Sequence, residues 1–339
     1  MNPDTFPPAP RVAVLGAGSW GSALGLLLAP AASSVLLVGR DAKVIEDINS
    51  NHRNQRYLPG IEFAGNLSAT ADLSAGADAD VVLFVVPSAA TREVAKKFAA
   101  LNPNPNAILV SCSKGIELGT GKRMSEIIAE HLPAHLLAVL SGPNHAEEVS
   151  RGLATATVIG SSEKDVSAYL QGLFTAPTFR SYTSDDLAGI ELGGAIKNLF
   201  AICSGIADGL GLGDNATAGL VTRGLAEMIR LGTTLGGRPD TFIGLSGVGD
   251  LIATCYSHHS RNFRAGIAIG KGKTVQQTLD AEGMVVEGIP NCQSVHEAAH
   301  RAGVRTPLID ALYAVLYEGK SPGAALQELL TRTPRSEND

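Results

Sequence analysis

Lys197 is the residue of this sequence best suited to acid–base chemistry. It is the only cation of residues 191–202, which are apolar nearly all round, as is typical of a buried helix. A buried lysine needs a partner or loses its charge, and burial lowers its pKa towards the range in which it exchanges a proton. Gly193 and Gly194 lie one turn earlier, and we expect them to leave room for a ligand. The alternative is a lysine that reaches out of the core to water.

Two polar segments follow apolar runs of the sequence. Lys114 comes just past the run at residues 108–112, and the segment SGPNHA at 141–146 leaves the next run in the same way. Ligands of open α/β sheets bind just beyond the carboxyl ends of the strands. Both segments are therefore candidates for a ligand site, although either could be only a turn.

Two expected helix starts carry groups that could bind or transform a ligand. Asp250 follows three residues of the segment GVGDL, where an acid serves either as a simple N-cap or in catalysis. Ser260, Arg261 and Asn262 open another helix. A hydroxyl, a guanidinium and an amide at a helix amino terminus suit a phosphate monoester.

A glycine-rich segment near the amino terminus has the pattern GxGxxG, with Gly16, Gly18 and Gly21 at the fixed positions. It follows an apolar run and opens an expected helix, and this context predicts a dinucleotide site. The three glycines would allow a tight turn, a close approach of the backbone to pyrophosphate, and close packing of helix on strand. The backbone amides of Ser19 and Trp20 would point at phosphate. The alternative is a glycine-rich turn without a ligand.

Arg40 stands about twenty residues further on, where an NAD-selective site usually places an acid. A guanidinium there could pair with a 2′-phosphate or stack on adenine, which favours NADP or at least tolerates it. The alternative for Arg40 is a solvated charge. We interpret the next residue, Asp41, as the N-cap of the following helix.

The elements that must position these residues fall into two halves. Up to about residue 185, continuous apolar runs alternate with helical patterns, which predicts a Rossmann-type, doubly wound α/β sheet covered on both faces. After residue 185 the strand patterns largely stop, and we expect an all-α substrate domain with the active cleft between the halves. The strands are expected at 11–15, 35–38, 81–86, 108–112 and 136–140. The helices are expected near 19–29, 42–54, 89–100, 121–131, 186–204, 215–235, 262–270, 274–282, 291–302 and 307–318.

The whole chain is expected to divide into a flexible tail at 1–10, a dinucleotide-binding domain at 11–185, a helical substrate and catalytic domain at 186–330, and a flexible tail at 331–339. Its 339 residues are 45% hydrophobic, which is enough to form a sizeable core. Its net charge of −6 provides no basic surface to attract nucleic acid. The four cysteines form no CxxC pair, which fits a reducing cytoplasm. We expect neither a signal peptide nor insertion into a membrane, because the most apolar segments look too short or too broken by glycine.

The ordered blocks GAGSWG, SKG, GPNHAEE, GGAIKN, RGLAEM, GVGDL, SRN and VVEG resemble the bacterial NAD(P)-dependent glycerol-3-phosphate dehydrogenases, from about residue 11 to 320. The resemblance implies a Rossmann domain joined to a helical substrate domain. It also implies reversible reduction of dihydroxyacetone phosphate to sn-glycerol 3-phosphate for phospholipid synthesis, with NADP or NAD as cofactor. We expect a homodimer.

The resemblance also implies roles for the matching residues. Lys197 matches the family's proton donor or acceptor. The matching cofactor positions are Ser19, Trp20, Arg40, Lys114, Ala146, Arg261, Val285 and Glu287. The matching substrate positions are Lys114, Gly142, Asn144, Asp250, Ser260, Arg261 and Asn262. Asn144 departs from the Ser or Thr often found at its position, although a carboxamide can still hydrogen-bond a substrate.

The mechanism expected from these roles is direct. NAD(P)H delivers hydride to the C2 carbonyl while Lys197 delivers a proton to its oxygen. Asp250 and Asn198 orient and charge-balance the lysine, so Lys197, Asp250 and Lys114 form the expected catalytic set. Lys114 and Asn262 polarise or hold hydroxyl groups, and Arg261 holds the phosphate. A lysine ammonium can stabilise the developing alkoxide, so no metal is needed.

Other patterns in the sequence allow different interpretations. His296 and His300 fit HExxH, the zinc-protease pattern, but no third ligand follows at a known spacing. We therefore expect no metal there, and none at His258 and His259. Glu227 is interpreted as an exposed helix charge. Two rival functions remain: a two-domain reductase that acts on a β-hydroxyacid, and a dinucleotide-sensing protein that binds cofactor without turnover.

Overall fold

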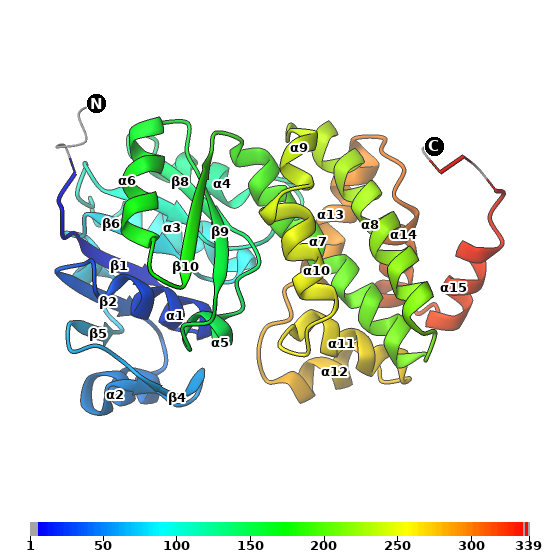
Figure 1. Cartoon of the computed structure of the whole chain (residues 1–339), viewed down its shortest axis with the longest axis horizontal. Helices are drawn as coiled ribbons and strands as arrows, with labels where there is room; N and C mark the ends of the chain where they lie inside the picture. Colours follow the sequence, from blue (N-terminus) through cyan, green and yellow to red (C-terminus); the bar gives the residue numbers. More distant parts are fainter. Residues whose placement is uncertain (1–5, 335, 338–339) are drawn as a thin grey trace.

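Two lobes of different architecture lie side by side in the computed structural model, which describes residues 6–334, 336 and 337 (Figure 1). The amino-terminal lobe is built on a sheet, and the carboxyl-terminal lobe consists of helices. The expected boundary at residues 185 and 186 stays a prediction; the last strand ends at Ser184, and the first long helix of the second lobe begins at Leu187. The expected flexible tails fall partly outside the described residues.

Eight of the described strands form one sheet, in the order β10-β9-β8-β7-β6-β1-β2-β5. Neighbouring strands are parallel except β8 and β9, which are antiparallel. The strands are β1 (Arg11–Leu15), β2 (Ser34–Val38), β5 (Leu67–Thr70), β6 (Val81–Phe84), β7 (Ile108–Ser111), β8 (Leu136–Ser141), β9 (Thr155–Gly160) and β10 (Phe179–Ser184). A small hairpin of β3 (Arg53–Asn54) and β4 (Leu58–Glu62) lies outside the sheet.

Both faces of the sheet are covered, which explains the continuous apolar runs in its strands. In β1, Val12 and Val14 belong to one hydrophobic cluster, whereas Ala13 and Leu15 belong to another. The first cluster includes residues of α1 (Ser19–Leu28), α2 (Ala42–Asn51) and α6 (Lys164–Phe174), and the second includes residues of α3 (Thr91–Ala99) and α4 (Met124–His131). The short helices η2 (Leu73–Gly76), η3 (Ser88–Ala90) and α5 (Ala146–Val149) complete this lobe. The predicted doubly wound sheet is confirmed.

The second lobe is organised around α7 (Leu187–Gly209), which contacts helices on several sides. Its crossing with α11 is very close, because Gly205 and Gly266 face each other: a Cβ on Gly266 would lie 2.2 Å from the carbonyl oxygen of Ile202. The other helices are α8 (Asp214–Thr234), α9 (Pro239–Phe242), the π-helical turn η4 (Leu245–Gly249), α10 (Asp250–Cys255), α11 (Arg261–Gly270), α12 (Val275–Glu282), α13 (Gly288–Arg301), α14 (Pro307–Tyr317) and α15 (Pro322–Leu330).

Helix α7 is longer than the sequence suggested, and its 23 residues are long and apolar enough to cross a membrane by length and composition alone. However, 94% of its apolar window is buried inside the protein. Packing within the second lobe therefore accounts for its composition. The expectation that this segment is too short to span was wrong, because the glycines within it do not break the helix.

Glu191 on α7 ties the two lobes together. Its carboxylate is 5% exposed and lies 2.9 Å from Nη1 of Arg123. It also accepts a hydrogen bond of 2.8 Å from the backbone N–H of Ser125, at the start of α4 in the sheet lobe. Burial raises the pKa of Glu191, while the charge of Arg123 opposes that rise. Because this buried carboxylate has both a cation and an N–H donor as partners, it can hold α7 against the start of α4.

Glu227 on α8 is not the exposed charge that we expected from the sequence. It is 3% exposed, and its carboxylate accepts hydrogen bonds from the backbone N–H groups of Leu308 at 2.8 Å and Ile309 at 3.3 Å. These N–H groups lie in the first turn of α14, where they have no partner within the helix. Burial raises the pKa of Glu227 to about 7, while the two backbone hydrogen bonds oppose the shift.

Candidate active site

The turn between β1 and α1 has the shape that a dinucleotide phosphate requires. Gly16 has φ +130, and a Cβ there would lie 2.4 Å from the carbonyl oxygen of Val85. A Cβ on Gly21 would lie 1.8 Å from the carbonyl oxygen of Gly16, so helix and strand touch through glycine. Above Gly18, in contrast, a Cβ would meet nothing within 4 Å. Tight backbone below and free space above are what the GxGxxG turn offers to pyrophosphate.

Other predicted cofactor residues surround this turn. Ser19 and Trp20 open α1, and the indole Nε1 of Trp20 is a buried donor without a hydrogen-bond partner among the described residues. Ala146 is the first residue of α5, which packs against α1. Arg40 is exposed just after β2; Lys97 lowers the pKa of Glu93 on α3, and the charge of Arg40 adds a smaller effect in the same direction. An unused buried donor beside an open glycine turn fits a bound dinucleotide.

The segment before α13 reaches the sheet lobe from the other side. Glu287 is partly buried and accepts a hydrogen bond of 2.8 Å from the hydroxyl of Ser88, in the turn after β6. Burial raises the pKa of Glu287. Val285 is 46% exposed, and its carbonyl oxygen accepts a hydrogen bond from Arg261 at 2.9 Å. Arg261 therefore lies near Val285 and Glu287, although it is 24 positions before Val285 in the sequence.

Two lysines share one buried carboxylate where the lobes meet. Lys197 Nζ lies 2.9 Å from Oδ1 of Asp250, and Lys114 Nζ lies 2.7 Å from Oδ2 of the same residue. Lys114 comes from the turn after β7, so this contact joins the sheet lobe to the helical lobe. Lys114 also donates to the carbonyl oxygen of Gly142 at 2.9 Å. The predicted catalytic residues Lys197, Asp250 and Lys114 thus lie together.

Thr254 completes this cluster, and the sequence reasoning missed it. Lys197 donates to the hydroxyl of Thr254 at 2.6 Å, and that hydroxyl lies 3.0 Å from Oδ1 of Asp250. A signal was present in the sequence, because residues four apart on a helix share one face. Once Asp250 is proposed to face Lys197, Thr254 should face it too.

The charges of the cluster depend on each other. Burial lowers the pKa of Lys197 to about 8; the carboxylate of Asp250 opposes this shift, and the charge of Lys114 adds to it. Burial would raise the pKa of Asp250, but the two lysines together hold it below its usual value. Asp250 is therefore ionised at neutral pH, whereas Lys197 can gain or lose a proton near pH 8. That combination suits a proton donor held in place by a permanent charge.

Asn198 and the paired glycines differ from expectation. The side chain of Asn198 hydrogen-bonds groups other than Lys197: its amide donates to the carbonyl oxygen of Gly194 at 3.4 Å, and its Oδ1 accepts from Asn262 at 2.9 Å. Successive side chains of a helix point about 100° apart, so Asn198 faces a different side of α7 from Lys197.

The space beside Gly193 and Gly194 is filled by protein: Cβ atoms there would lie 2.6 Å from the Ser246 carbonyl oxygen and the Ser141 hydroxyl, respectively.

The predicted substrate residues lie in two groups. Asn144 follows β8 near the lysines, and both polar atoms of its side chain are buried without a partner among the described residues, as is the hydroxyl of Ser141. Buried amides are nearly always hydrogen-bonded, so this pair of orphaned atoms indicates that a ligand completes the site. In the second group, Ser260 caps α11 by accepting from Phe263 N, and Arg261 and Asn262 form its first turn.

Asp41, outside the substrate residues, is confirmed as the N-cap of α2.

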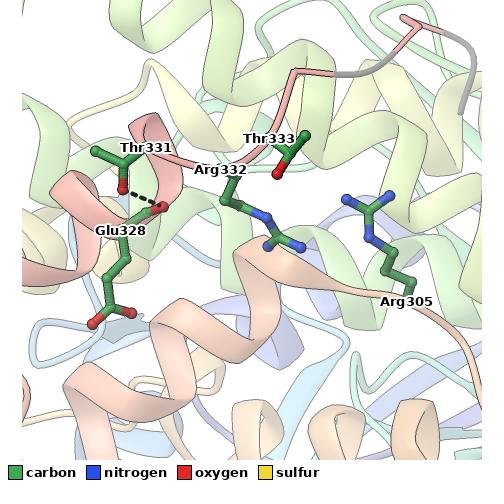
Figure 2. Close-up of a pocket in the computed structure, with 5 residues that line it drawn as sticks. All are labelled: Arg305, Glu328, Thr331, Arg332 and Thr333. Atoms are coloured by element: carbon green, nitrogen blue, oxygen red, sulfur yellow. Dashed lines mark hydrogen bonds between the residues drawn. The ribbon is translucent and has the colours of Figure 1, made fainter.

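A pocket elsewhere in the helical lobe does not belong to this site. Figure 2 shows it beside the end of α15, where the guanidinium groups of Arg305 and Arg332 point toward each other. Thr331, Thr333 and Glu328 complete its lining. All five residues come from the last turns of the chain or the segment before α14, and none is a predicted site residue. The lysine–aspartate cluster remains the better candidate for chemistry.

The chain resembles known proteins in both sequence and structure. Residues 11–167 match the amino-terminal domain family described as "NAD-dependent glycerol-3-phosphate dehydrogenase N-terminus", and residues 186–327 match the corresponding carboxyl-terminal family. A "Glycerol-3-phosphate dehydrogenase [NAD(P)+]" from Carboxydothermus hydrogenoformans is 48% identical over 332 residues, which cover 96% of this chain and 98% of the relative. A relative of the same name from Moorella thermoacetica is 46% identical over 326 residues, covering 96% of each chain.

A solved structure agrees with these sequence relatives. The crystal structure of glycerol-3-phosphate dehydrogenase from Coxiella burnetii superimposes with a TM-score of 0.92 at 38% identity. The superposition covers 96% of this chain and 100% of the Coxiella chain. The likeness therefore extends over both lobes and over the arrangement of the lobes.

Proposed function

The chain belongs to the NAD-dependent glycerol-3-phosphate dehydrogenase family, and we propose that the Lys197–Asp250–Lys114 cluster carries its proton chemistry. The protein is an NAD(P)-dependent oxidoreductase that acts on a CH–OH group. It interconverts dihydroxyacetone phosphate and sn-glycerol 3-phosphate, the precursor of phospholipids. The single observation that carries the proposal is the buried carboxylate shared by two lysines beside the orphaned side chain of Asn144.

Different groups of the enzyme transfer the hydride and the proton. The nicotinamide cofactor, when bound on the Gly16–Gly21 turn, supplies hydride to C2 of the substrate. Lys197 in its ammonium form donates a proton to the carbonyl oxygen as that oxygen becomes an alkoxide, and is left as a neutral amine. In the reverse reaction the amine accepts the proton of the C2 hydroxyl. Asp250 and Thr254 hold the lysine nitrogen at this position.

The remaining polar groups are assigned to binding. Lys114 and the amide of Asn144 line the sheet side of the cluster and would hold the substrate's oxygens. Arg261, at the start of α11, would bind the phosphate, with the hydroxyl and amide of Ser260 and Asn262 beside it. Arg40 would bind the 2′-phosphate of NADP, so we propose that the enzyme accepts NADP at least as well as NAD.

Two features of the working enzyme stay predictions. The cytoplasmic setting is supported by the four cysteines, which are all free and buried. A homodimer is checked by light scattering on the purified protein, which would give twice the mass of 35.0 kDa.

The test is to follow oxidation of NADPH and of NADH with dihydroxyacetone phosphate and, separately, with unphosphorylated dihydroxyacetone and a β-keto acid. We expect rapid turnover with the phosphorylated ketone alone. Turnover with the β-keto acid instead would favour the rival reductase. Cofactor binding without turnover of any substrate would favour a sensing protein and would overturn the proposed role of the cluster.

A further inference from the structure

The HExxH segment gains a third ligand from a neighbouring helix. His296 and His300 lie one turn apart on α13, and Asp310 projects from α14, which packs against α13. One ligand atom from each residue can be chosen so that all three lie within 4.8 Å of one another. The sequence alone offered no third ligand at a known spacing, because Asp310 reaches the histidines only through the packing of two helices.

The distances in this cluster suit a shared metal ion better than direct hydrogen bonds. Nε2 of His296 lies 3.6 Å from Oδ1 of Asp310, and Nε2 of His300 lies 3.4 Å from the same oxygen. Hydrogen bonds from N–H to oxygen are usually about 2.7–3.2 Å long. Ligand atoms at about 2.0–2.2 Å from a tetrahedral zinc ion lie roughly 3.3–3.6 Å from one another. The two measured separations match the edges of that tetrahedron.

We propose that His296, His300 and Asp310 bind one divalent transition-metal ion, zinc above all, and that this ion clamps α13 to α14. The ion fits the donor set, because two imidazoles and one carboxylate are common zinc ligands. A water molecule would occupy the fourth position, since the side chains of His300 and Asp310 are 62% and 46% exposed.

The surroundings orient the ligands. The ring of His296 stacks on Tyr313 with centroids 3.9 Å apart and an angle of 3° between the planes, so its direction is set by packing. The hydroxyl of Thr306 lies 3.3 Å from Oδ1 of Asp310. Neighbours that hold ligand side chains in this way typically raise metal affinity. Glu318 lines the same pocket and adds negative charge; of the two cations that line it, Lys320 and Arg332, Lys320 is paired with Glu328 at 2.8 Å.

The proposed role is binding and stabilisation, and no catalytic step. In the zinc-protease pattern the glutamate of HExxH acts as a base. Here Glu297 lies outside the group of candidate ligands and accepts from Gln293 at 3.3 Å. The dehydrogenase reaction needs none of these residues. The proposal therefore stands apart from the active site, and it replaces our expectation that the motif binds no metal.

The test is a calorimetric titration with zinc chloride of the full-length protein, freed of any polyhistidine tag and stripped with a chelator. The same titration is made on His300→Ala, Asp310→Asn and the matched control Glu297→Gln. The melting temperature of each protein with and without zinc is the second readout. Dehydrogenase activity shows that each variant is folded.

We expect the wild type to bind one zinc ion per chain and to melt at a higher temperature with it. Glu297→Gln should behave like the wild type, whereas His300→Ala and Asp310→Asn should each lose at least about tenfold in affinity for zinc. The absence of stoichiometric binding to the wild type would overturn the proposal. Equal binding by wild type, His300→Ala and Asp310→Asn would do so as well, because the ion would then lie elsewhere. If one variant fails to fold, the other decides.

Discussion

Nζ of Lys197 lies 2.9 Å from Oδ1 of Asp250, and both side chains are almost completely buried, at 7% and 3% exposure. A buried ion pair of this kind contributes little net stability, because desolvation offsets most of the attraction. Its value is in positioning: the carboxylate fixes the nitrogen, and burial brings the lysine pKa close to the pH of the cell.

Replacing Lys197 with methionine should abolish proton transfer and spare the fold. Methionine fills similar space without charge, and Lys114 still neutralises Asp250. We expect kcat to fall by roughly 10²–10⁴-fold while cofactor affinity stays close to wild type. Steady-state kinetics and a fluorescence titration with NADPH check this, with the exposed Lys271→Met as control. A near-normal kcat would make Lys197 structural, and Lys114 would become the next candidate.

The two directions of the reaction should respond oppositely to pH. Burial lowers the pKa of Lys197 to about 8, so the ammonium form prevails below that pH and the amine above it. Ketone reduction needs the ammonium, so its kcat/KM should fall as pH rises through about 8. Alcohol oxidation needs the amine, so its kcat/KM should rise over the same range. Profiles that move in the same direction would exclude Lys197 as the titrating group; the apparent value belongs to the coupled cluster.

Replacing Arg40 with aspartate should change the choice of cofactor. The exposed guanidinium after β2 is proposed to pair with a 2′-phosphate, and a carboxylate there would repel it. We expect KM for NADPH to rise by at least about tenfold, or 1.4 kcal/mol, with a much smaller change for NADH. Lys43→Asp, on the following helix, controls for the general change in charge. Equal effects on both cofactors would mean that Arg40 does not bind the 2′ position.

Replacing Arg261 with alanine should weaken binding of the substrate phosphate. The residue opens α11, and its removal should raise KM for dihydroxyacetone phosphate by an amount that corresponds to roughly 2–5 kcal/mol. Because Arg261 also lies beside Val285, the cofactor KM must be measured in the same series. Arg264→Ala, one turn along the helix, is the matched control. An unchanged KM for the phosphorylated substrate would contradict the assignment.

Replacing Glu227 with glutamine should change how stability depends on pH. Burial raises the pKa of Glu227 from 4.5 to about 7, so the folded state binds an extra proton between these values. This contribution to stability is full below pH 4.5 and is lost as pH rises through 7. Wild type should therefore lose roughly 3 kcal/mol relative to Glu227→Gln between pH 4.5 and 8. Urea unfolding across that range measures the difference, and parallel curves would refute it.

The fold was predictable wherever a local pattern dictated it. Strand β1 is apolar at every position after Arg11 because both its faces are buried, and that pattern is visible without a structure. Strands β9 and β10 were missed because threonines and serines interrupt their runs, as in Thr155–Gly160. Strand β5, of four residues at the edge of the sheet, was missed for similar reasons.

The sequence allowed the residues of the site to be predicted better than the contacts between them. Motifs identified Lys114, Lys197 and Asp250, but Lys114 and Asp250 are separated by 136 positions, and no local pattern reports that they meet. For the same reason Glu227 was misinterpreted, since its partner at Leu308 is 81 positions away. Asn198 was expected to orient Lys197, but adjacent residues of a helix face different directions.

The bridge from Lys114 to Asp250 has a consequence for motion between the lobes. Lys114 belongs to the sheet lobe, whereas Asp250 and Lys197 belong to the helical lobe. The charge of Lys114 helps to hold down the pKa of Lys197, and such repulsion weakens as charges separate. If the lobes part, Lys197 becomes a weaker acid and takes up a proton from water. If they close, it becomes a readier donor. The Lys114–Asp250 contact therefore couples the proton affinity of Lys197 to the distance between the two lobes.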